Sequence, residues 1–336
     1  MFSHIVPTTY LKSWKIPNSS NSIYLFKKNE IADKGKKRNL LNLSGTSFGK
    51  KNFYYLKIET CDSKIYDPLF LPIISYLEND YIVRYKDKSI TKNNPGLFRI
   101  VYLNKKSDLQ LIRKKDGIEI NIESINSTIN SLWNDTQKRF IENFFSNVLE
   151  NNWNCFLEKT QNIHTDFVID EDLKRYIILF ITLQFFRDGL QIDEYLSSII
   201  SSFKPIDYQK NNIQNNILID ILYEFILDFN EHNATSSNII YNTFLNLISS
   251  NWCFNFNINR QGTFLTSDTP VFVDYYNGQE SIIFPLTPSI CLALTNSKKD
   301  NAKVKELTQS EIQIINNLII KNSKEYVVYN NSYISY

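Results

Sequence analysis

The sequence is poor in the residues that interrupt regular structure, since its 336 residues include only eight glycines and nine prolines. Collagen-like repeats and flexible linkers are rich in these residues, so the composition excludes both. Hydrophobic residues make up 43% of the chain and aromatic residues 14%, more apolar material than disordered proteins carry. A chain of this length and composition can bury a stable core without disulfides or metals.

Cysteine and histidine are scarce and scattered. The four cysteines lie far apart and form no CxxC pair, and the three histidines, His4, His164 and His232, are equally dispersed. We therefore expect no zinc site and no disulfide-linked partner. Any metal would have to be held by carboxylates with few histidines.

The sequence also lacks a long apolar run and a secretory signal. Its most apolar span, Tyr176 to Phe186, is too short to cross a bilayer and is followed by Arg187 and Asp188. The opening MFSHIVP has neither a basic region nor a small-residue cleavage site. We therefore expect a buried helix at this span, no membrane partner and a cytoplasmic location.

The numbers of positive and negative side chains are nearly equal, and the net charge is +2. The whole chain therefore attracts nucleic acid only weakly. The densest basic run contains Lys27, Lys28, Lys34, Lys36, Lys37, Arg38, Lys50 and Lys51. Two interpretations of this run stay open: a solvated surface loop, or a patch that contacts phosphate.

Strand patterns occur near both ends of the chain, where β-branched and aromatic residues are enriched. Strands are expected at residues 22–26, 81–85, 97–103, 252–256, 263–265, 271–275, 281–284, 290–293 and 325–329. The dipeptide Asn277-Gly278 is typical of a hairpin turn between two of them.

Helical spacing dominates the middle of the chain. Helices are expected at residues 69–77, within 122–148, after Asp170, and at 217–229, 239–247 and 309–321. Asp67 and Asp170 are expected to cap two of these helices, and Gly189 to end the second.

Together these patterns predict an α+β fold, in which a mixed or antiparallel sheet of N- and C-terminal strands packs against a mainly helical middle section. We expect one domain over residues 1–336. It would be strand-rich over 1–120, helical over 121–250, and strand-rich with a terminal helix over 251–336.

Three small polar residues, Thr266, Ser267 and Asp268, interrupt the apolar segment FLTSDTPVFV. They suit a turn, because short polar side chains bond to nearby backbone groups and Pro270 restricts its predecessor. They also suit a site, because a second proline-marked strand, FPLTP, follows closely and suggests a shaped edge. Spacing alone does not decide between these interpretations.

Gln184 and Arg187 lie one turn apart on a helix that is apolar on most sides, so both are expected beside a core. A buried guanidinium needs a carboxylate, backbone carbonyls or a bound anion. Asp268 is the natural candidate for an ion pair with Arg187. His4, near the start of the chain, is a candidate for proton transfer at neutral pH.

Several segments resemble the uncharacterised bacterial family known as domain of unknown function 4238. HIVPTTYLKSW is similar to its HxxPxxYLxxF opening, and LQFFRDG to its Gln-aromatic-Leu-Arg segment. NWCFNFNINRQGTFLTSDTPV, FPLTP and INNLIIKNSKEYVVY match later segments in the same order, while Trp14 and Thr8 stand where Phe and Gln are usual. The family has no settled activity, but the resemblance raises His4, Gln184, Arg187, Ser267 and Asp268 together as motif residues expected to converge.

The first functional hypothesis is a hydrolase acting on a nucleotide or phosphodiester, which is nuclease-like and of the kind found in bacterial toxins or antiphage effectors. Arg187 would bind phosphate, His4 would act as general acid or base, and Asp268 would orient His4 or bind Mg²⁺. Gln184, Thr266 and Ser267 would position the substrate.

Two other hypotheses stay open. The same cluster could form a non-catalytic binding or sensor module for a small anionic ligand or a peptide. Alternatively, the motifs could be wholly structural and lock the two ends of the chain around the helices. Oligomeric state does not follow from the sequence.

Overall fold

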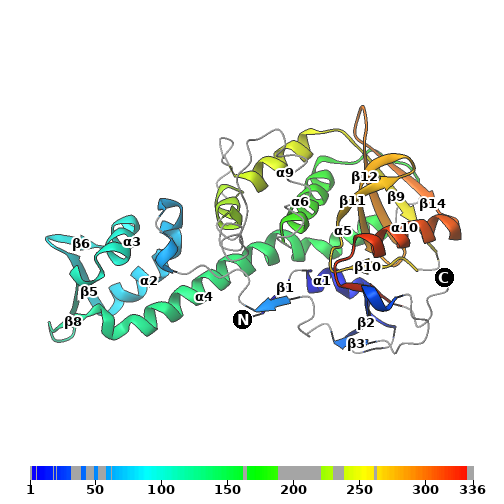
Figure 1. Ribbon diagram of the computed structural model, residues 1–336. Helices are drawn as coiled ribbons and strands as arrows, with labels where there is room; N and C mark the ends of the chain where they lie inside the picture. Colours follow the sequence, from blue (N-terminus) through cyan, green and yellow to red (C-terminus); the bar gives the residue numbers. More distant parts are fainter. Residues whose placement is uncertain are drawn as a thin grey trace. The chain divides into compact units, whose positions relative to one another are not determined.

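The protein has an α+β fold, as the sequence predicts (Figure 1). The computed structural model describes residues 2–4, 6–17, 19, 21–31, 39–42, 49–51, 58–61, 63–161, 165–187, 221–229, 238–260 and 263–330. Within this part of the chain, no helix combines the length and the apolar character that a bilayer crossing needs.

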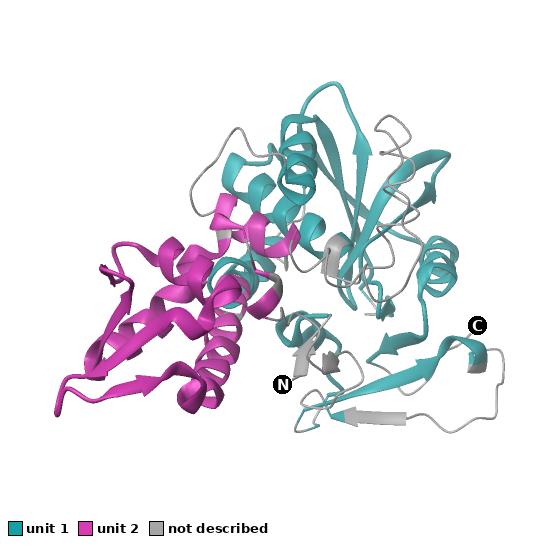
Figure 2. Cartoon of the chain, turned by 60° about the vertical axis from the view of Figure 1, so that its left-hand side comes forward, with its two compact units in different colours: residues 1–53, 146–210, 235–336 teal, residues 54–145, 211–234 magenta. Residues whose placement is uncertain are grey.

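The chain divides into two compact units (Figure 2). Unit 1 comprises residues 1–53, 146–210 and 235–336, and unit 2 comprises residues 54–145 and 211–234. The chain therefore enters and leaves unit 2 twice. The expectation of a single domain over residues 1–336 stays a prediction.

A five-stranded sheet forms the centre of unit 1, with the order β11-β12-β13-β9-β14. Its strands are β9 (Trp252–Ile258), β11 (Phe272–Tyr276), β12 (Gln279–Thr287), β13 (Ile290–Asn296) and β14 (Asn301–Glu306). Only the β9–β14 pair is parallel, so the sheet is mixed. The expected hairpin turn is confirmed at Asn277 and Gly278, whose φ values of 52° and 77° suit a primed turn between β11 and β12.

A second sheet of unit 1 joins strands from both ends of the chain, as predicted. Its order is β10-β15-β2-β3, formed by β10 (Thr266–Ser267), β15 (Tyr326–Tyr329), β2 (Ser22–Lys27) and β3 (Asn39–Asn42). The short strands β1 (Phe2–His4) and β4 (Gly49–Lys51) form a separate antiparallel pair.

Helices cover the five-stranded sheet on both faces. The helices of unit 1 are α1 (Thr8–Leu11), η1 (Lys12–Trp14), η2 (Lys28–Glu30), α5 (Asn151–Gln161), α6 (Glu171–Arg187), α9 (Ile239–Ser249) and α10 (Gln309–Asn322). Ile283 of β12 belongs to one buried cluster with Ile315 and Ile319 of α10. Its neighbour Phe284 points to the other face, where its ring stacks on Phe180 of α6.

Unit 2 contains a third sheet, of order β6-β5-β7-β8, packed beside helices. Its strands are β5 (Tyr81–Tyr85), β6 (Lys88–Ile90), β7 (Leu109–Arg113) and β8 (Glu119–Asn121). Its helices are η3 (Ile58–Thr60), η4 (Lys64–Tyr66), α2 (Asp67–Asp80), α3 (Pro95–Asn104), η5 (Lys106–Asp108), η6 (Ile122–Ile125) and α4 (Asn126–Phe144). Residues 221–229 are also helical, and the π-helical segment η7 (Phe145–Glu150) connects α4 to α5 along the chain.

Two expectations for unit 2 are wrong. Residues 97–103, expected as a strand, lie in helix α3, because Pro95 starts the helix and Phe98, Val101 and Tyr102 place their side chains on one buried face. Asp67 does not cap α2, since its carboxylate accepts a 2.6 Å hydrogen bond from Nε of the buried Arg99.

Two further differences concern unit 1. Residues 263–265, expected as a strand, precede the short strand β10 rather than forming one. Strand β14 is not predicted from the sequence, because its alternating lysines leave few apolar side chains in the segment. Four parts of the predictions lie outside the described residues: His164, His232, Gly189 and residues 217–220.

Candidate functional site

His4 lies on β1, where the backbone register places it opposite Gly49 of β4. Lys50 and Lys51 follow Gly49 on β4 and pair with Ser3 and Phe2. One end of the predicted basic run is thus strand rather than loop, and it shares a two-stranded sheet with the candidate histidine. The structure describes the backbone of His4 but not its side chain.

Helix α6 carries Gln184 and Arg187. The predicted cap is confirmed, because Oδ1 of Asp170 accepts a 2.6 Å hydrogen bond from the backbone N–H of Leu173. Gln184 is only 5% exposed, and its Nε2 has no hydrogen-bond partner within the described part of the chain. Arg187 is the last residue of α6, and its side chain lies outside the description. Convergence of His4, Arg187 and Asp268 therefore stays a prediction.

Thr266 and Ser267 form β10 and are completely buried. The hydroxyl of Tyr10 donates to the carbonyl oxygen of Pro285 at 2.6 Å and lies 2.5 Å from Oγ1 of Thr266. Because the single phenolic proton goes to Pro285, the Thr266 hydroxyl acts as donor to Tyr10. Oγ of Ser267 donates to the carbonyl of Thr269 and accepts from its N–H, which is the local bonding of a turn.

The carboxylate of Asp268 binds backbone groups that follow α10. Its Oδ1 accepts a 3.0 Å hydrogen bond from Lys324 N, and its Oδ2 accepts bonds from Glu325 N at 2.8 Å and Tyr326 N at 3.0 Å. The N–H of Asp268 donates in turn to the carbonyl of Tyr326. Asp268 therefore joins the TSDTP segment to the start of β15, which is a structural contact.

An aromatic cluster brings the motif segments together. The ring of Tyr10 lies 4.9 Å from Trp14, 5.5 Å from Trp153 of α5, 6.2 Å from Phe180 of α6 and 5.6 Å from Phe284 of β12. These residues come from four separate parts of the chain. Gln184 follows Phe180 by one helical turn, so its amide lies on the face of α6 that bears this cluster.

Trp153 is a member of this cluster that sequence reasoning missed. It is 1% exposed, its ring packs 4.7 Å from Phe180, and its Nε1 has no hydrogen-bond partner among the described residues. A buried indole N–H usually finds an acceptor. It lies in α5, beyond the helical pattern expected within residues 122–148, and a tryptophan in such a position is equally typical of a core residue.

Two other motif residues hold the segment before β10 in place. Nε1 of Trp14 donates to the carbonyl of Phe264 at 3.2 Å. Asn316 of α10 donates from Nδ2 to Thr263 O and accepts from Leu265 N at Oδ1, both at 3.0 Å. The opening motif and the terminal helix therefore fix the same short segment from two sides.

Burial keeps the reactive groups of this region neutral. It raises the pKa of the Tyr10 hydroxyl well above its usual value, by more than the hydrogen bond from Thr266 lowers it. It likewise raises the pKa of the Cys291 thiol, outweighing a backbone hydrogen bond from Phe284. Neither group is suited to act as an anionic nucleophile at neutral pH.

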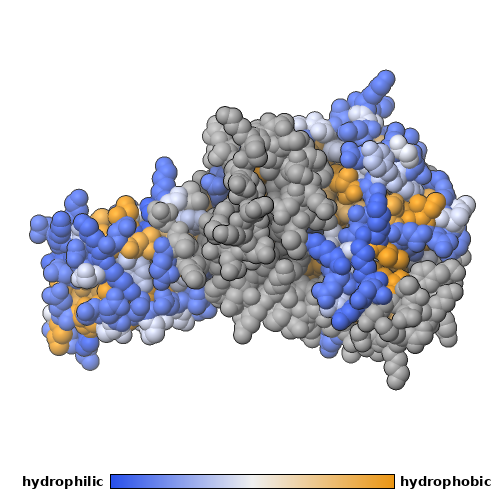
Figure 3. Space-filling model, viewed as in Figure 1, coloured by the Kyte–Doolittle hydropathy of each residue, from blue (hydrophilic) through white to orange (hydrophobic). Residues whose placement is uncertain are grey.

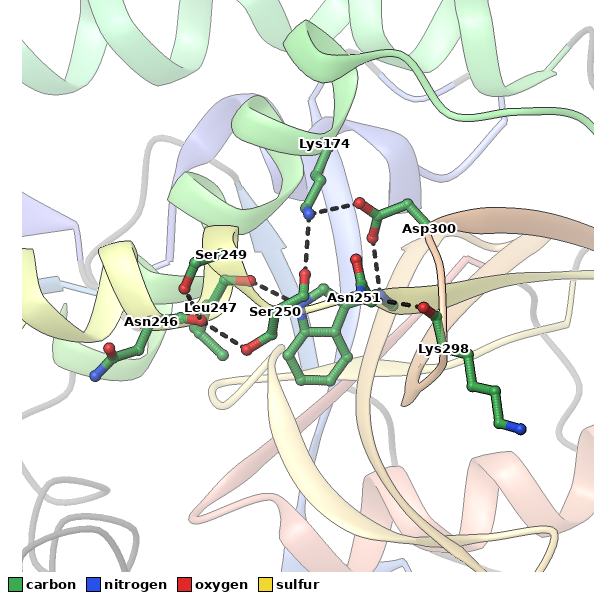
Figure 4. Close-up of polar contacts among 9 residues, drawn as sticks. Lys174, Asn246, Leu247, Ser249, Ser250, Asn251, Lys298 and Asp300 are labelled. Carbon is green, nitrogen blue, oxygen red and sulfur yellow. Dashed lines mark hydrogen bonds and ion pairs between the residues drawn. The ribbon is translucent and has the colours of Figure 1, made fainter.

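A buried cation lies elsewhere in unit 1, where Figure 4 shows Lys174 between two acceptors. Its Nζ lies 2.9 Å from the carbonyl of Ser250 and 2.7 Å from Oδ2 of Asp300. Oδ1 of Asp300 accepts from Trp252 N at 2.8 Å. The ammonium is thus bonded to protein groups that hold the start of β9, and it has a structural role.

The described residues contain no group of three or more His, Cys, Asp or Glu side chains that could hold a metal ion. They also contain no disulfide bond. Asp268, the candidate ligand for Mg²⁺, has both oxygens engaged by backbone N–H groups.

Comparison with known proteins identifies one family. The profile described as "Protein of unknown function (DUF4238)" matches residues 3–333, which is nearly the whole chain. The comparisons found no curated protein and no solved structure that matches the chain.

Proposed function

The chain belongs to the DUF4238 family of proteins of unknown function, and from that premise we propose that it binds and hydrolyses a phosphate ester, either a nucleotide or a phosphodiester. The observation that carries the proposal is the pairing of β1 with β4, which places His4 on the same two-stranded sheet as Lys50 and Lys51. A histidine can transfer protons near neutral pH, and lysines bind phosphate as point charges. This pairing favours the phosphate interpretation of the basic run.

Helix α6 supplies the second part of the proposed site. Arg187 would bind a phosphate through two parallel N–H···O bonds, which its planar guanidinium suits better than an ammonium does. Gln184, three residues earlier, has a buried amide nitrogen with no acceptor among the described residues. A phosphate oxygen is such an acceptor, so Gln184 and Arg187 would hold the substrate while His4 transfers a proton.

The contacts of TSDTP support a different role from the one expected for it. Thr266, Ser267 and Asp268 are bonded to Tyr10, Thr269 and residues 324–326, so they shape the structure around the site. In the proposal they position other groups, and Asp268 remains the candidate carboxylate that orients His4.

The second candidate function is a module that binds an anionic ligand without transforming it. Nε2 of Gln184, which has no acceptor within the described part of the chain, favours this module, because a buried donor that can take a ligand acceptor suits recognition as well as catalysis. The two candidates share the same ligand chemistry and differ only in whether a product forms.

The test is to incubate the purified chain with mononucleotides, cyclic nucleotides, RNA and DNA, with and without Mg²⁺, and to analyse products by chromatography and gels. His4→Ala and Arg187→Ala should abolish turnover with little change in melting temperature. His232→Ala and Arg260→Ala are matched controls, the latter at a side chain that is 79% exposed. Binding that depends on Arg187 but yields no product would select the second candidate, and large losses of stability in both variants would select the structural interpretation.

We also propose that the protein is located in the cytoplasm and has a defensive role, as a toxin or antiphage effector. Expression in a bacterial host should then lower the plating efficiency of some phages, and His4→Ala should restore it. Equal plating with and without the protein across a broad phage panel would contradict this assignment.

A further inference from the structure

The sheet of unit 2 has one buried face and one face open to solvent. Val83, Ile90 and Leu111, which lie side by side on β5, β6 and β7, are at most 2% exposed. The alternate positions are exposed except for Ile112, which is half-buried, as expected for an antiparallel sheet covered by helices on one side.

The open face carries a row of polar side chains across all four strands. Ser89, Arg84, Gln110 and Asn121 occupy directly opposed positions on β6, β5, β7 and β8, and each is exposed. Beside this row, Ile82 lies opposite Ile112, and Ile82 is 38% exposed. Hydrogen-bonding groups and apolar groups therefore alternate along one flat surface.

This part of the sequence is also strongly basic. Residues 81–121 contain ten lysines and arginines but only four acidic residues, whereas the whole chain has a net charge of +2. The remainder of the chain is therefore net acidic. In Figure 3 the part of unit 2 that is coloured shows mainly hydrophilic surface, with several hydrophobic spots.

Exposed cations lie at both ends of the sheet. Lys86 lies in the turn between β5 and β6, and Lys88, the first residue of β6, lies opposite Tyr85 at the edge of the covered face. Lys114 and Lys115 lie in the turn between β7 and β8, where Nζ of Lys114 donates to the carbonyl of Glu78 at 2.6 Å. The two turns lie at opposite ends of the sheet, because Tyr85 pairs with Leu109 and Tyr81 with Arg113. Arg84 lies between them, so positive charge extends along the face.

Ion pairs cancel part of this charge. Asp116 pairs with Arg113 at 3.0 Å, and Arg99 and Lys106 pair with Asp67 and Glu123, which lie outside the segment, at 2.6 Å and 3.5 Å. Asp87 lies in the turn between Lys86 and Lys88, Glu119 lies opposite Ile112 on the open face, and Asp108 precedes β7. The unbalanced lysines and Arg84 still outnumber these carboxylates.

We propose that the open face of the β5–β8 sheet binds the phosphate backbone of a single-stranded nucleic acid. The row of Arg84, Gln110 and Asn121 would contact phosphates and base edges, the lysines at both turns would contact flanking phosphates, and Ile82 with Ile112 would contact unstacked bases. Four strands spaced about 4.8 Å apart span about 14 Å between outer axes, which exceeds the width of about 12 Å of a duplex major groove. The face therefore suits a single strand better than a duplex.

This surface is separate from the residues of the proposed hydrolase and does not depend on turnover. A protein that binds the strand without cleaving it would leave the surface assignment intact and remove the hydrolase proposal. Conversely, cleavage by a chain whose β5–β8 face does not bind would leave the hydrolase proposal intact.

The test measures fluorescence anisotropy of a labelled oligothymidylate over a series of salt concentrations, with a gel to show that the oligonucleotide stays intact. The triple variant Arg84→Ala/Lys86→Ala/Lys88→Ala should bind more weakly, and the slope of log K against log salt should fall by about 2, since each phosphate contact contributes about 0.7. The triple Lys298→Ala/Lys299→Ala/Lys303→Ala, which removes three exposed lysines of unit 1, should bind like the unchanged protein.

The double variant Lys114→Ala/Lys115→Ala gives an independent measurement if the triple variant does not fold. Weaker binding by either variant of the sheet, with the unit 1 control unaffected, supports the assignment. Absence of binding by the unchanged protein overturns it. Equal weakening by the unit 1 control, tighter binding of duplex DNA, or preference for phosphatidylserine vesicles over the oligonucleotide would do the same.

Discussion

The hydroxyl of Tyr10 lies 2.5 Å from Oγ1 of Thr266, although 256 residues separate the two in sequence. The same hydroxyl donates to Pro285 O at 2.6 Å. One completely buried side chain of the opening motif therefore binds both proline-marked segments, TSDTP and FPLTP. Much of the family's sequence pattern consequently has a structural purpose that can be measured separately from activity.

Tyr10→Phe should destabilise unit 1. The change leaves the Thr266 hydroxyl and the Pro285 carbonyl in the core without their partner, so the free energy of unfolding should fall by about 1–3 kcal/mol. Urea denaturation at constant m-value measures the change. Tyr275→Phe, at a side chain that is 70% exposed, is the matched control and should change stability by less than about 0.5 kcal/mol. Equal effects of the two substitutions would contradict the role given to the Tyr10 bonds.

Asp268→Asn should weaken the junction between TSDTP and β15. The amide keeps one acceptor oxygen but turns an NH₂ group toward backbone N–H donors, which repel it. A loss of about 2 kcal/mol is expected, because hydrogen bonds to a charged group are involved. Asp87→Asn, in an exposed turn, provides the control. If Asp268→Asn instead abolished turnover without changing stability, the residue would belong to the catalytic site.

Gln184→Met separates a structural glutamine from a ligand-binding one. Methionine has a similar length and no unsatisfied donor, so in the absence of ligand the free energy of unfolding should stay constant or rise by up to about 2 kcal/mol. Binding of the ligand or turnover should be lost in the same variant. A clear loss of stability would show that Nε2 has a partner in the folded protein, and it would remove Gln184 from the proposed site.

Asp274 should make stability depend on pH in the acid range. Burial alone would raise the pKa of its carboxyl, but hydrogen bonds from Lys321, Asn322 and the backbone of Tyr275 lower it below the usual value. A lowered pKa contributes stability that is present above the unfolded value, near 3.9, and is lost as the pH falls through the folded value. The stability difference between the unchanged protein and Asp274→Asn should therefore be constant above about pH 5 and shrink below about pH 4. A difference that grows as the pH falls would contradict this.

Local signals predicted local structure well. Asp170 caps α6 through the N–H of Leu173, and Asn277-Gly278 forms the expected turn, because both depend on backbone groups only a few residues away. The strand expected at residues 97–103 failed for a local reason too. Its apolar residues fit both periods, and Pro95 together with burial beside α2 selects the helix.

Long-range contacts could not be predicted in the same way. The sequence suggested Arg187 or His4 as a side-chain partner for Asp268, which stays a prediction, but it did not indicate the three bonds from the backbone N–H groups of residues 324–326 to the Asp268 carboxylate. Every residue except proline carries such a donor, so sequence patterns do not mark them. The role of Trp153 and the ion pair between Lys174 and Asp300 were not predicted for a related reason. In each case the contacting residue lies on an element that is distant in the sequence.

The sheet that joins β2 to β15 has a consequence for how the chain matures. During synthesis β2 leaves the ribosome about 300 residues before the strand that will lie against it, so this edge of β2 stays unpaired until β15 has been made. Closure of so long a loop is slow compared with the formation of hairpins such as β11–β12. The nascent polypeptide therefore exposes an edge of β2 to chaperones and proteases while the intervening residues are made, until pairing with β15 covers it.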